Sequence, residues 1–141
     1  MSEFQLHPQL AADTLPVASL PLCDVLLMND AHYPWLILVP RVADASELLD
    51  LNEGDRTRLW REIDIASRAL REQFVPDKLN IAALGNMVNQ LHVHVVARFK
   101  GDAAWPKPVW GAQPARPYPA EDSVERLSRL RDVLERLVNE G

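Results

Sequence analysis

The sequence contains a single cysteine, Cys23, so no intrachain disulfide can form. A chain without disulfides is typical of a reducing compartment. Its longest apolar runs, Val25–Met28 and Trp35–Pro40, are far shorter than the roughly 20 residues that a membrane-spanning helix needs. No basic segment followed by an apolar run stands at the N-terminus, so we expect no signal peptide. These absences predict a cytoplasmic protein without a membrane partner.

Positive charge is also scarce. The chain has 15 Lys and Arg residues against 20 Asp and Glu residues, which gives a formal net charge of -5. DNA and RNA are bound by broad positive surfaces, so this balance argues against a nucleic-acid partner. It does not exclude a phosphate ligand, because a pocket can bind phosphate through a few aimed donors. The glycine-rich fingerprints of P-loop and dinucleotide-binding proteins are absent, and so are internal repeats.

Short apolar runs dominate what is present. With 141 residues, 48% of them hydrophobic, the chain can form one core, and we expect a single domain over residues 1–141. The first two runs flank a turn-like segment at residues 29–34, which favours a hairpin. The runs that we predict to be strands are Leu22–Met28, Trp35–Arg41, Lys78–Leu84 and Leu91–Phe99.

Two segments space their apolar side chains by three or four residues, as amphipathic helices do. The first begins at Asp55 and ends before Pro76, and the second covers Asp122–Asn139. Residues 1–20 are expected to form an edge segment, or a short helix followed by a loop, and residues 100–119 a long loop. The strands mostly follow one another without intervening helices, which favours the α+β class. We therefore predict an antiparallel sheet with one central helix and one C-terminal helix.

The chemistry is concentrated in the strand segment Gln90–Val96. Alternate side chains of a strand share a face, so the apolar ones point to a core and Gln90, His92 and His94 point to the other side. Burying polar side chains on so hydrophobic a strand costs free energy, so their presence there suggests a function. Neutral imidazole is a nucleophile near pH 7, and a second, protonated imidazole can bind phosphate or give a proton to a leaving group.

A metal site is a second interpretation of the histidine pair, because His-x-His on a strand often provides two metal ligands. Such a site needs further ligands, and none has a diagnostic spacing. The candidates for these further ligands are His7, Cys23, Asp24, Asp30 and His32.

The run Gln-Leu-His-Val-His-Val-Val resembles the signature of the histidine triad (HIT) proteins, in which three histidines alternate with apolar residues and a pair of apolar residues follows. The preceding segment Gly85–Asn89 resembles the family's turn into that signature, and Trp35–Pro40 resembles its earlier strand, which ends in proline. The resemblance covers about Leu22 to Phe99. It implies an antiparallel sheet with helices, a homodimer, and hydrolysis or transfer of nucleoside monophosphate groups.

The resemblance also implies roles for single residues. Val95 and Val96 match the terminal apolar pair, so His92 matches the middle histidine, which attacks the α-phosphorus to give a nucleotidyl-histidine. His94 matches the third histidine, which binds phosphate and assists the leaving group. Gln90 stands in place of the first histidine, which mainly orients its neighbours, and Gln cannot titrate. The other register, with His92 first, fits less well because it breaks the terminal apolar pair.

Four further residues are candidates for nucleotide binding. The family holds the ribose with an acidic or amide side chain near the end of an earlier strand, where Asn29 and Asp30 both stand. Asn86 could supply the phosphate donor that Met87 cannot, or could serve only as a turn residue. Arg98 shares the histidine face by parity, so it could meet a distal phosphate or lie at a solvated strand end.

Trp105 and Trp110, in the long loop, either stack on a base or pack at the dimer interface or under the loop, and packing is favoured. The sequence as a whole predicts a nucleotidyl hydrolase of dinucleoside polyphosphates or nucleoside phosphoramidates. The covalent step needs no metal, although Mg²⁺ can accompany the substrate. The alternatives are a nucleotide-binding module with little turnover and a histidine-based metal-binding protein.

Overall fold

A computed structural model describes residues 3–141 of the chain. The long loop expected at residues 100–119 contains no helix or strand. The elements, in chain order, are α1 (Pro8–Asp13), β1 (Thr14–Ser19), β2 (Cys23–Met28), β3 (Trp35–Pro40), the 3₁₀ turn η1 (Leu48–Asp50), α2 (Glu53–Phe74), β4 (Lys78–Ala83), β5 (Val93–Arg98) and α3 (Ala120–Glu140).

The strands form one antiparallel sheet in the order β1-β2-β3-β5-β4. β2 and β3 pair with each other, which confirms the predicted hairpin. β5 lies between β3 and β4, and His94 is opposite Ile37 on one side and Ala82 on the other. The strand that carries His94 is therefore hydrogen-bonded along both edges.

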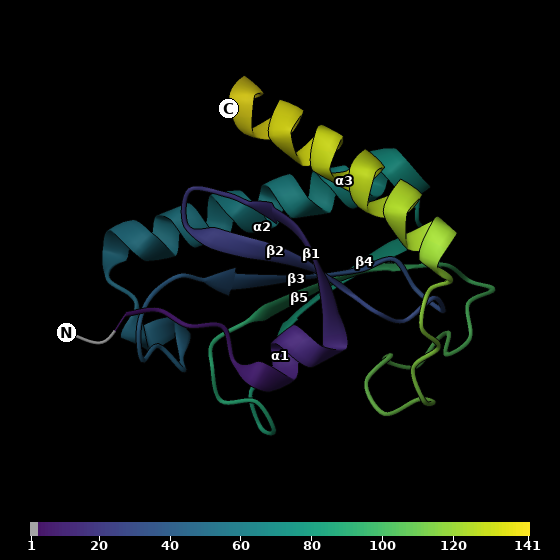
Figure 1. Ribbon diagram of the computed structural model, residues 1–141, viewed down its shortest axis with the longest axis horizontal. Helices are drawn as coiled ribbons and strands as arrows, with labels where there is room; N and C mark the ends of the chain where they lie inside the picture. The colour runs from purple at the N-terminus through teal and green to yellow at the C-terminus, as the bar shows by residue number, and fades with distance from the viewer. Residues whose placement is uncertain (1–2) are drawn as a thin grey trace.

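The two faces of the sheet are covered differently. α2 and α3 lie together on one face, and α1 lies on the other (Figure 1). Val93 and Val95 of β5 belong to the main core beneath α2 and α3. Val96 belongs to a smaller core on the other face, which the segment before α1 and Val109 of the long loop help to close. The alternation predicted for this strand is thus observed, and the α+β class with a central and a C-terminal helix is confirmed.

The helix α2 has the expected start and stop signals. Its N-cap residue Asn52 accepts a hydrogen bond from the backbone N–H of Asp55. It ends at Val75, which has a left-handed conformation, before Pro76. Most of the apolar stripe is buried, namely Leu59, Ile63, Ala66 and Leu70.

None of the helices within residues 3–141 is long and apolar enough to cross a membrane.

A buried carboxylate joins α2 to the start of β2. Glu62 accepts the backbone N–H of Leu22 at 2.8 Å and that of Cys23 at 2.7 Å, one on each oxygen. Burial and the neighbouring Glu62 raise the pKa of the Cys23 thiol, so this cysteine stays protonated and unreactive. Glu62 therefore supplies acceptors for two backbone donors at the turn between β1 and β2.

Two expectations about element bounds need correction. Residues 3–20 contain the short helix α1 of one alternative and, in place of the loop expected after it, the edge strand β1, which agrees with the other alternative of an edge segment. Residues 1–2 lie outside the described part. β1 contains Pro16 and an irregular register between Pro16 and Ala18, which hide the alternation that marks a strand. The strand predicted from Leu91 begins only at Val93, so His92 lies immediately before it.

Candidate active site

His92 and His94 lie side by side at the start of β5. Their ring centroids are 4.9 Å apart, with the rings nearly perpendicular. Both side chains lie on the face opposite α2 and α3, and only 6% of His92 and 5% of His94 is exposed. The expectation that alternate residues would share this face is therefore met by the two histidines.

The hydrogen bond of His92 determines its tautomer. Nδ1 of His92 lies 2.6 Å from the backbone carbonyl oxygen of Gln90. A carbonyl oxygen only accepts, so Nδ1 carries the proton and donates it. Nε2 of the neutral ring then keeps its lone pair, and this nitrogen has the chemistry of a nucleophile.

His94 has the opposite tautomer. The indole Nε1–H of Trp35, which can only donate, points at Nδ1 of His94 at 3.0 Å. The proton of neutral His94 is therefore on Nε2. Burial, with the charge of His92 as a smaller cause, lowers the pKa of His94 to about 4. His94 is thus uncharged at neutral pH, which corrects the expectation of a protonated second imidazole.

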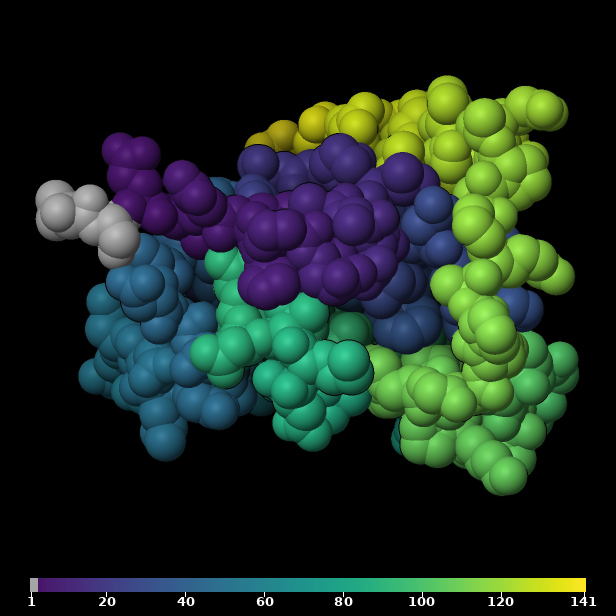
Figure 2. All heavy atoms as spheres, turned by 60° about the horizontal axis from the view of Figure 1, so that its bottom comes forward, coloured from purple at the N-terminus to yellow at the C-terminus, as the bar shows by residue number. Residues whose placement is uncertain are grey.

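The side chain of Gln90 has a different role from the one expected. Its Oε1 accepts the backbone N–H of His7 at 2.8 Å, and its Nε2 donates to the backbone carbonyl of Gln5 at 2.8 Å. Only the main chain of Gln90 orients His92. The side chain instead links the N-terminal segment to the loop before β5 through these two bonds. Figure 2 shows the purple N-terminal segment lying against the green surface of residues close to position 90.

Gln90→Ala is expected to lower the free energy of unfolding by about 1–2 kcal/mol, because two backbone groups lose their partners. Turnover should fall less than about tenfold, because the backbone carbonyl that orients His92 remains. Urea unfolding and steady-state kinetics measure the two effects. A loss of turnover as large as that of a His92 variant would show that the Gln90 side chain acts in the chemistry.

A pocket of about 510 Å³ opens onto His92. The 3₁₀ turn η1 contributes Leu48 and Leu49, and the end of β4 and the loop after it contribute Leu84 and Asn86. Asn86 is exposed and lines this pocket together with His92, and its role as a phosphate donor rather than a turn residue stays a prediction. Gln90 also lines the pocket.

Asn29 and Asp30 anchor the loop that leads to α3. Oδ1 of Asn29 accepts the backbone N–H of Tyr118 at 2.9 Å. Oδ1 of Asp30 accepts the backbone N–H groups of His32 and Arg116 and lies 2.6 Å from the His32 ring. Neither residue lines the pocket at His92. Their ribose-binding role stays a prediction, and the side chains are already occupied in this conformation.

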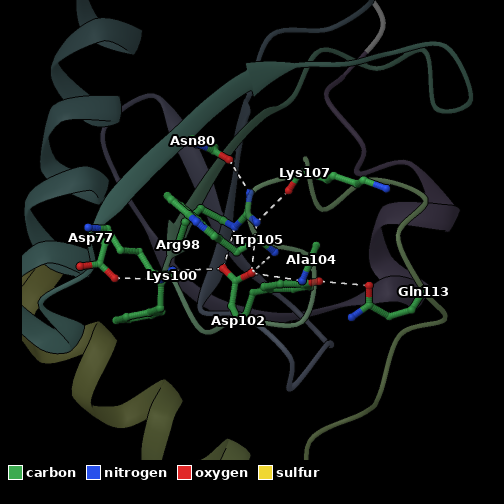
Figure 3. Close-up of polar contacts among 11 residues, drawn as sticks. Asp77, Asn80, Arg98, Lys100, Asp102, Ala104, Trp105, Lys107 and Gln113 are labelled. Atoms are coloured by element: carbon green, nitrogen blue, oxygen red, sulfur yellow. Dashed lines mark hydrogen bonds and ion pairs between the residues drawn. The ribbon is translucent and has the colours of Figure 1, made fainter.

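Arg98 lies in a buried cluster at the far end of β5 (Figure 3). Its guanidinium donates to both carboxylate oxygens of Asp102, to Oδ1 of Asn80 and to the backbone carbonyl of Lys107. It also lies over the ring of Trp105, 5.6 Å from the centroid. These bonds tie the long loop to the sheet, so the guanidinium of Arg98 is not free to meet a distal phosphate. Because Arg98 is buried, the alternative of a solvated strand end is wrong.

The Arg98 cluster predicts an acid-sensitive contribution to stability. Burial alone raises the pKa of Asp102, but Arg98 and three backbone N–H groups outweigh burial and lower it to about 2. Because the unfolded value is about 3.9, the stabilisation is complete above that pH and is lost as the pH falls towards 2. Asp102→Asn should cost about 2 kcal/mol at pH 7. Urea unfolding at pH 7 and pH 2.5 tests this, and an equal cost at both would contradict it.

Comparison with known proteins identifies the family. The model of the HIT domain matches residues 10–101. The chain belongs to the histidine triad family. This HIT protein is 50% identical to a histidine triad protein from Bradyrhizobium japonicum, with 94% of this chain and 99% of that chain covered and a TM-score of 0.92. It is 49% identical to one from Marinobacter aquaeolei, with 96% and 99% covered and a TM-score of 0.93. No curated protein matches.

Family membership makes the chain a nucleotide-binding protein of the hydrolase type.

A zinc-bound histidine triad family protein from Mycobacterium smegmatis has the same fold, with a TM-score of 0.62 and 18% identity over 94% of each chain. Within residues 3–141 of this HIT protein, no three His, Cys, Asp or Glu side chains are grouped to hold a metal ion. The additional ligands considered for a metal site therefore do not join His92 and His94 in such a group among the described residues.

The tryptophans of the long loop pack within this HIT protein. Trp110 meets the ring of His94 edge-on at 5.3 Å between centroids and that of Trp35 at 6.1 Å. Its indole N–H is buried and has no hydrogen-bond partner among residues 3–141. Trp105 lies against Arg98. Of the packing alternatives, packing under the loop is the one observed, and packing at a dimer interface stays a prediction. Sequence reasoning missed Trp35, because its contact with His94 depends on the pairing of β3 with β5.

Proposed function

We propose that this HIT protein is a nucleotidyl hydrolase that forms a covalent nucleotidyl-histidine at His92. Its substrates are nucleotide phosphoanhydrides or phosphoramidates, the class that includes dinucleoside polyphosphates. The observation that carries the proposal is the hydrogen bond from Nδ1 of His92 to the Gln90 carbonyl. This bond leaves the Nε2 lone pair available beside the pocket that reaches His92.

The neighbouring residues have complementary roles in this proposal. Nε2–H of His94 donates a hydrogen bond to a phosphate oxygen, and the amide of Asn86 provides a second donor. The carbonyl of Gln90 stabilises the positive charge that the His92 ring gains when Nε2 bonds to phosphorus. The covalent step uses no metal, and Mg²⁺ enters only as a counter-ion of the substrate.

The test is to trap the intermediate. Native protein is mixed with diadenosine tetraphosphate or adenosine 5′-phosphoramidate labelled at the α-phosphorus, and the reaction is quenched within milliseconds. We expect release of AMP and a labelled protein whose phosphorus–nitrogen bond is cleaved by acid. Binding without labelled protein or AMP would favour the nucleotide-binding module instead. Label retained by His92→Ala would show that another residue is the nucleophile.

We also propose that two copies associate through β4. This strand is at an edge of the sheet, and 47% of its Ile81 is exposed. A free strand edge with an apolar side chain is a ready surface for pairing with a second chain. Ile81→Asp is therefore expected to shift the protein towards monomer, as measured by sedimentation equilibrium, whereas Val124→Asp on exposed α3 is the control. A native protein that is already monomeric at high micromolar concentration would contradict the proposal.

A further inference from the structure

A second cavity, of about 610 Å³, lies where the end of α2 meets the start of α3 (Figure 1). Ala31, which precedes β3, is part of its wall. His92 lies towards the other end of that strand, because it precedes Val93, the partner of Leu38. The two cavities have no lining residue in common. The volume is typical of sites for small molecules, so this second cavity is large enough for a ligand of its own.

Positive charge prevails among the side chains that line this cavity, with three arginines against two acidic residues. Arg129 is paired with Glu125 at 2.6 Å, so these two charges offset each other. Asp122 lies in the first turn of α3, where the helix dipole stabilises a carboxylate. Arg116 and Arg126 form no ion pair within residues 3–141. The cavity therefore has two guanidinium groups whose charge no carboxylate balances directly.

Arg126 is held in place by aromatic rings. Its guanidinium carbon lies 4.7 Å from the centre of the Phe74 ring and 5.1 Å from that of Tyr118. Nη1 of Arg126 donates a hydrogen bond to the Tyr118 hydroxyl at 2.8 Å. Burial raises the pKa of the Tyr118 phenol, although Arg126 opposes the change, so the phenol stays neutral. The position of the guanidinium is thus fixed, but its charge is not neutralised.

The other arginines with little exposure have the partner that Arg126 lacks. Besides Arg126, the arginines that are buried or half-buried within residues 3–141 are Arg41, which pairs with Asp24, and Arg98, which pairs with Asp102. Removing a cation from water costs free energy, and a paired carboxylate offsets that cost. A half-buried guanidinium without a carboxylate is therefore suited to receive an anion from outside the chain.

The wall that carries Arg116 and Tyr118 is fastened to the turn after β2. The backbone N–H of Arg116 donates to Oδ1 of Asp30 at 3.2 Å, and its carbonyl accepts the N–H of Ala31 at 2.6 Å. Oδ1 of Asn29 accepts the N–H of Tyr118. These bonds form the wall before any ligand arrives, which lowers the entropic cost of binding. Asn29 and Asp30 thus help to shape this cavity.

We infer that this cavity binds a small organic anion, whose carboxylate or phosphate group is held by Arg116 and Arg126. A guanidinium binds either group through parallel hydrogen bonds. The rings of Phe74 and Pro119 offer apolar contacts to the body of the ligand, and the amide of Gln73 offers a further hydrogen bond. An excess of one positive charge suits one or two negative charges better than a polyphosphate. The inference goes beyond the proposed hydrolase activity and does not depend on it.

A nuclear magnetic resonance titration tests the inference directly. Nitrogen-15-labelled native protein is titrated in turn with phenyl phosphate, benzoate and neutral benzyl alcohol. We expect the amide signals of Ala31, Tyr118 and Arg126 to shift with a Kd below about 1 mM for at least one of the anions, and not with the alcohol. The relative affinities of the two anions show whether the site prefers phosphate or carboxylate.

Two results of this titration would overturn the inference. One is the absence of shifts with both anions at about 10 mM, a concentration well above the expected Kd. The other is a set of shifts confined to residues of the pocket at His92, such as Asn86 and Leu91. Because only binding is measured, neither result affects the proposed nucleotidyl-histidine mechanism.

Arg116→Gln should weaken binding of the preferred anion at least about tenfold, because a charge-assisted hydrogen bond is lost. Arg56→Gln is the matched control and should bind within about twofold of native protein. Arg56 is also exposed and forms no ion pair within the described residues, but it lies near the start of α2, outside the cavity. Equal weakening in both variants would mean that only the overall charge matters and would overturn the inference.

Two further variants act on the same site in opposite directions. Arg126→Gln should abolish measurable binding, whereas Asp122→Asn should strengthen it about threefold by removing a like charge from the cavity. Thermal unfolding shows whether Arg126→Gln keeps its fold, since the guanidinium also packs on two rings. The side chain of Arg116 forms no hydrogen bond or ion pair within residues 3–141, so Arg116→Gln is decisive even if the Arg126 variant unfolds. Native affinity in Arg116→Gln would contradict the inference.

Discussion

Replacing His92 with alanine is expected to lower nucleotide turnover by about 10⁴-fold or more, because loss of a covalent nucleophile removes the reaction path itself. The change should leave substrate affinity within a few-fold of native. His94→Ala should cost less, about 100-fold, since it removes one hydrogen bond to the phosphate. Initial rates of AMP release from each purified variant, with native protein alongside, measure these effects.

The fold of the variants must be checked because both rings are buried. Thermal unfolding provides this check, and His92→Asn offers a smaller change that keeps a polar side chain near the Gln90 carbonyl. Equal losses in His92→Ala and His94→Ala would contradict the division of roles. Turnover close to native in His92→Ala would rule out the assigned nucleophile and the register on which it rests.

Glu62→Gln is expected to reduce the free energy of unfolding by about 3 kcal/mol, the largest effect among the stability changes considered. The native carboxylate accepts the N–H of Leu22 and that of Cys23 with separate oxygens. An amide has one oxygen, so its NH₂ would face a backbone donor and leave that donor unpaired in a site only 2% exposed. Urea unfolding at neutral pH measures the loss.

The same helix supplies a matched control. Glu72 forms an ion pair with Arg136, and both side chains are well exposed. Glu72→Gln should therefore cost under about 1 kcal/mol, as surface ion pairs do. Comparable costs for Glu62→Gln and Glu72→Gln would mean that the two backbone hydrogen bonds contribute little.

Local patterns were sufficient for much of the fold and for the centre of the site. The spacing of apolar side chains gave α2 and most of α3, and alternation placed His92 and His94 on one face. These features depend on residues close in sequence. An edge segment was one of two alternatives for the region of β1, but its strand could not be delimited because Pro16 and the irregular register beside it obscure the period.

The remaining site geometry depends on contacts between distant residues. Gln90 is bonded to residues more than 80 positions away, and Trp35 reaches His94 across 59 positions. Arg98 was expected to be free because its partner Asp102 lies in a loop whose path no local pattern predicts. Side-chain type indicated what each residue can do, whereas the tertiary fold decided which groups were already occupied.

The position of β5 between two partner strands also has a consequence for amide hydrogen exchange. Its backbone is paired with both β3 and β4 and its residues are buried, so its amides should exchange only when much of the sheet opens. Residues 83–86, which form a wall of the pocket, are exposed and should exchange through small local openings. The pocket at His92 thus lies beside a slowly exchanging strand and has a wall that can adapt to the shape of a bound ligand.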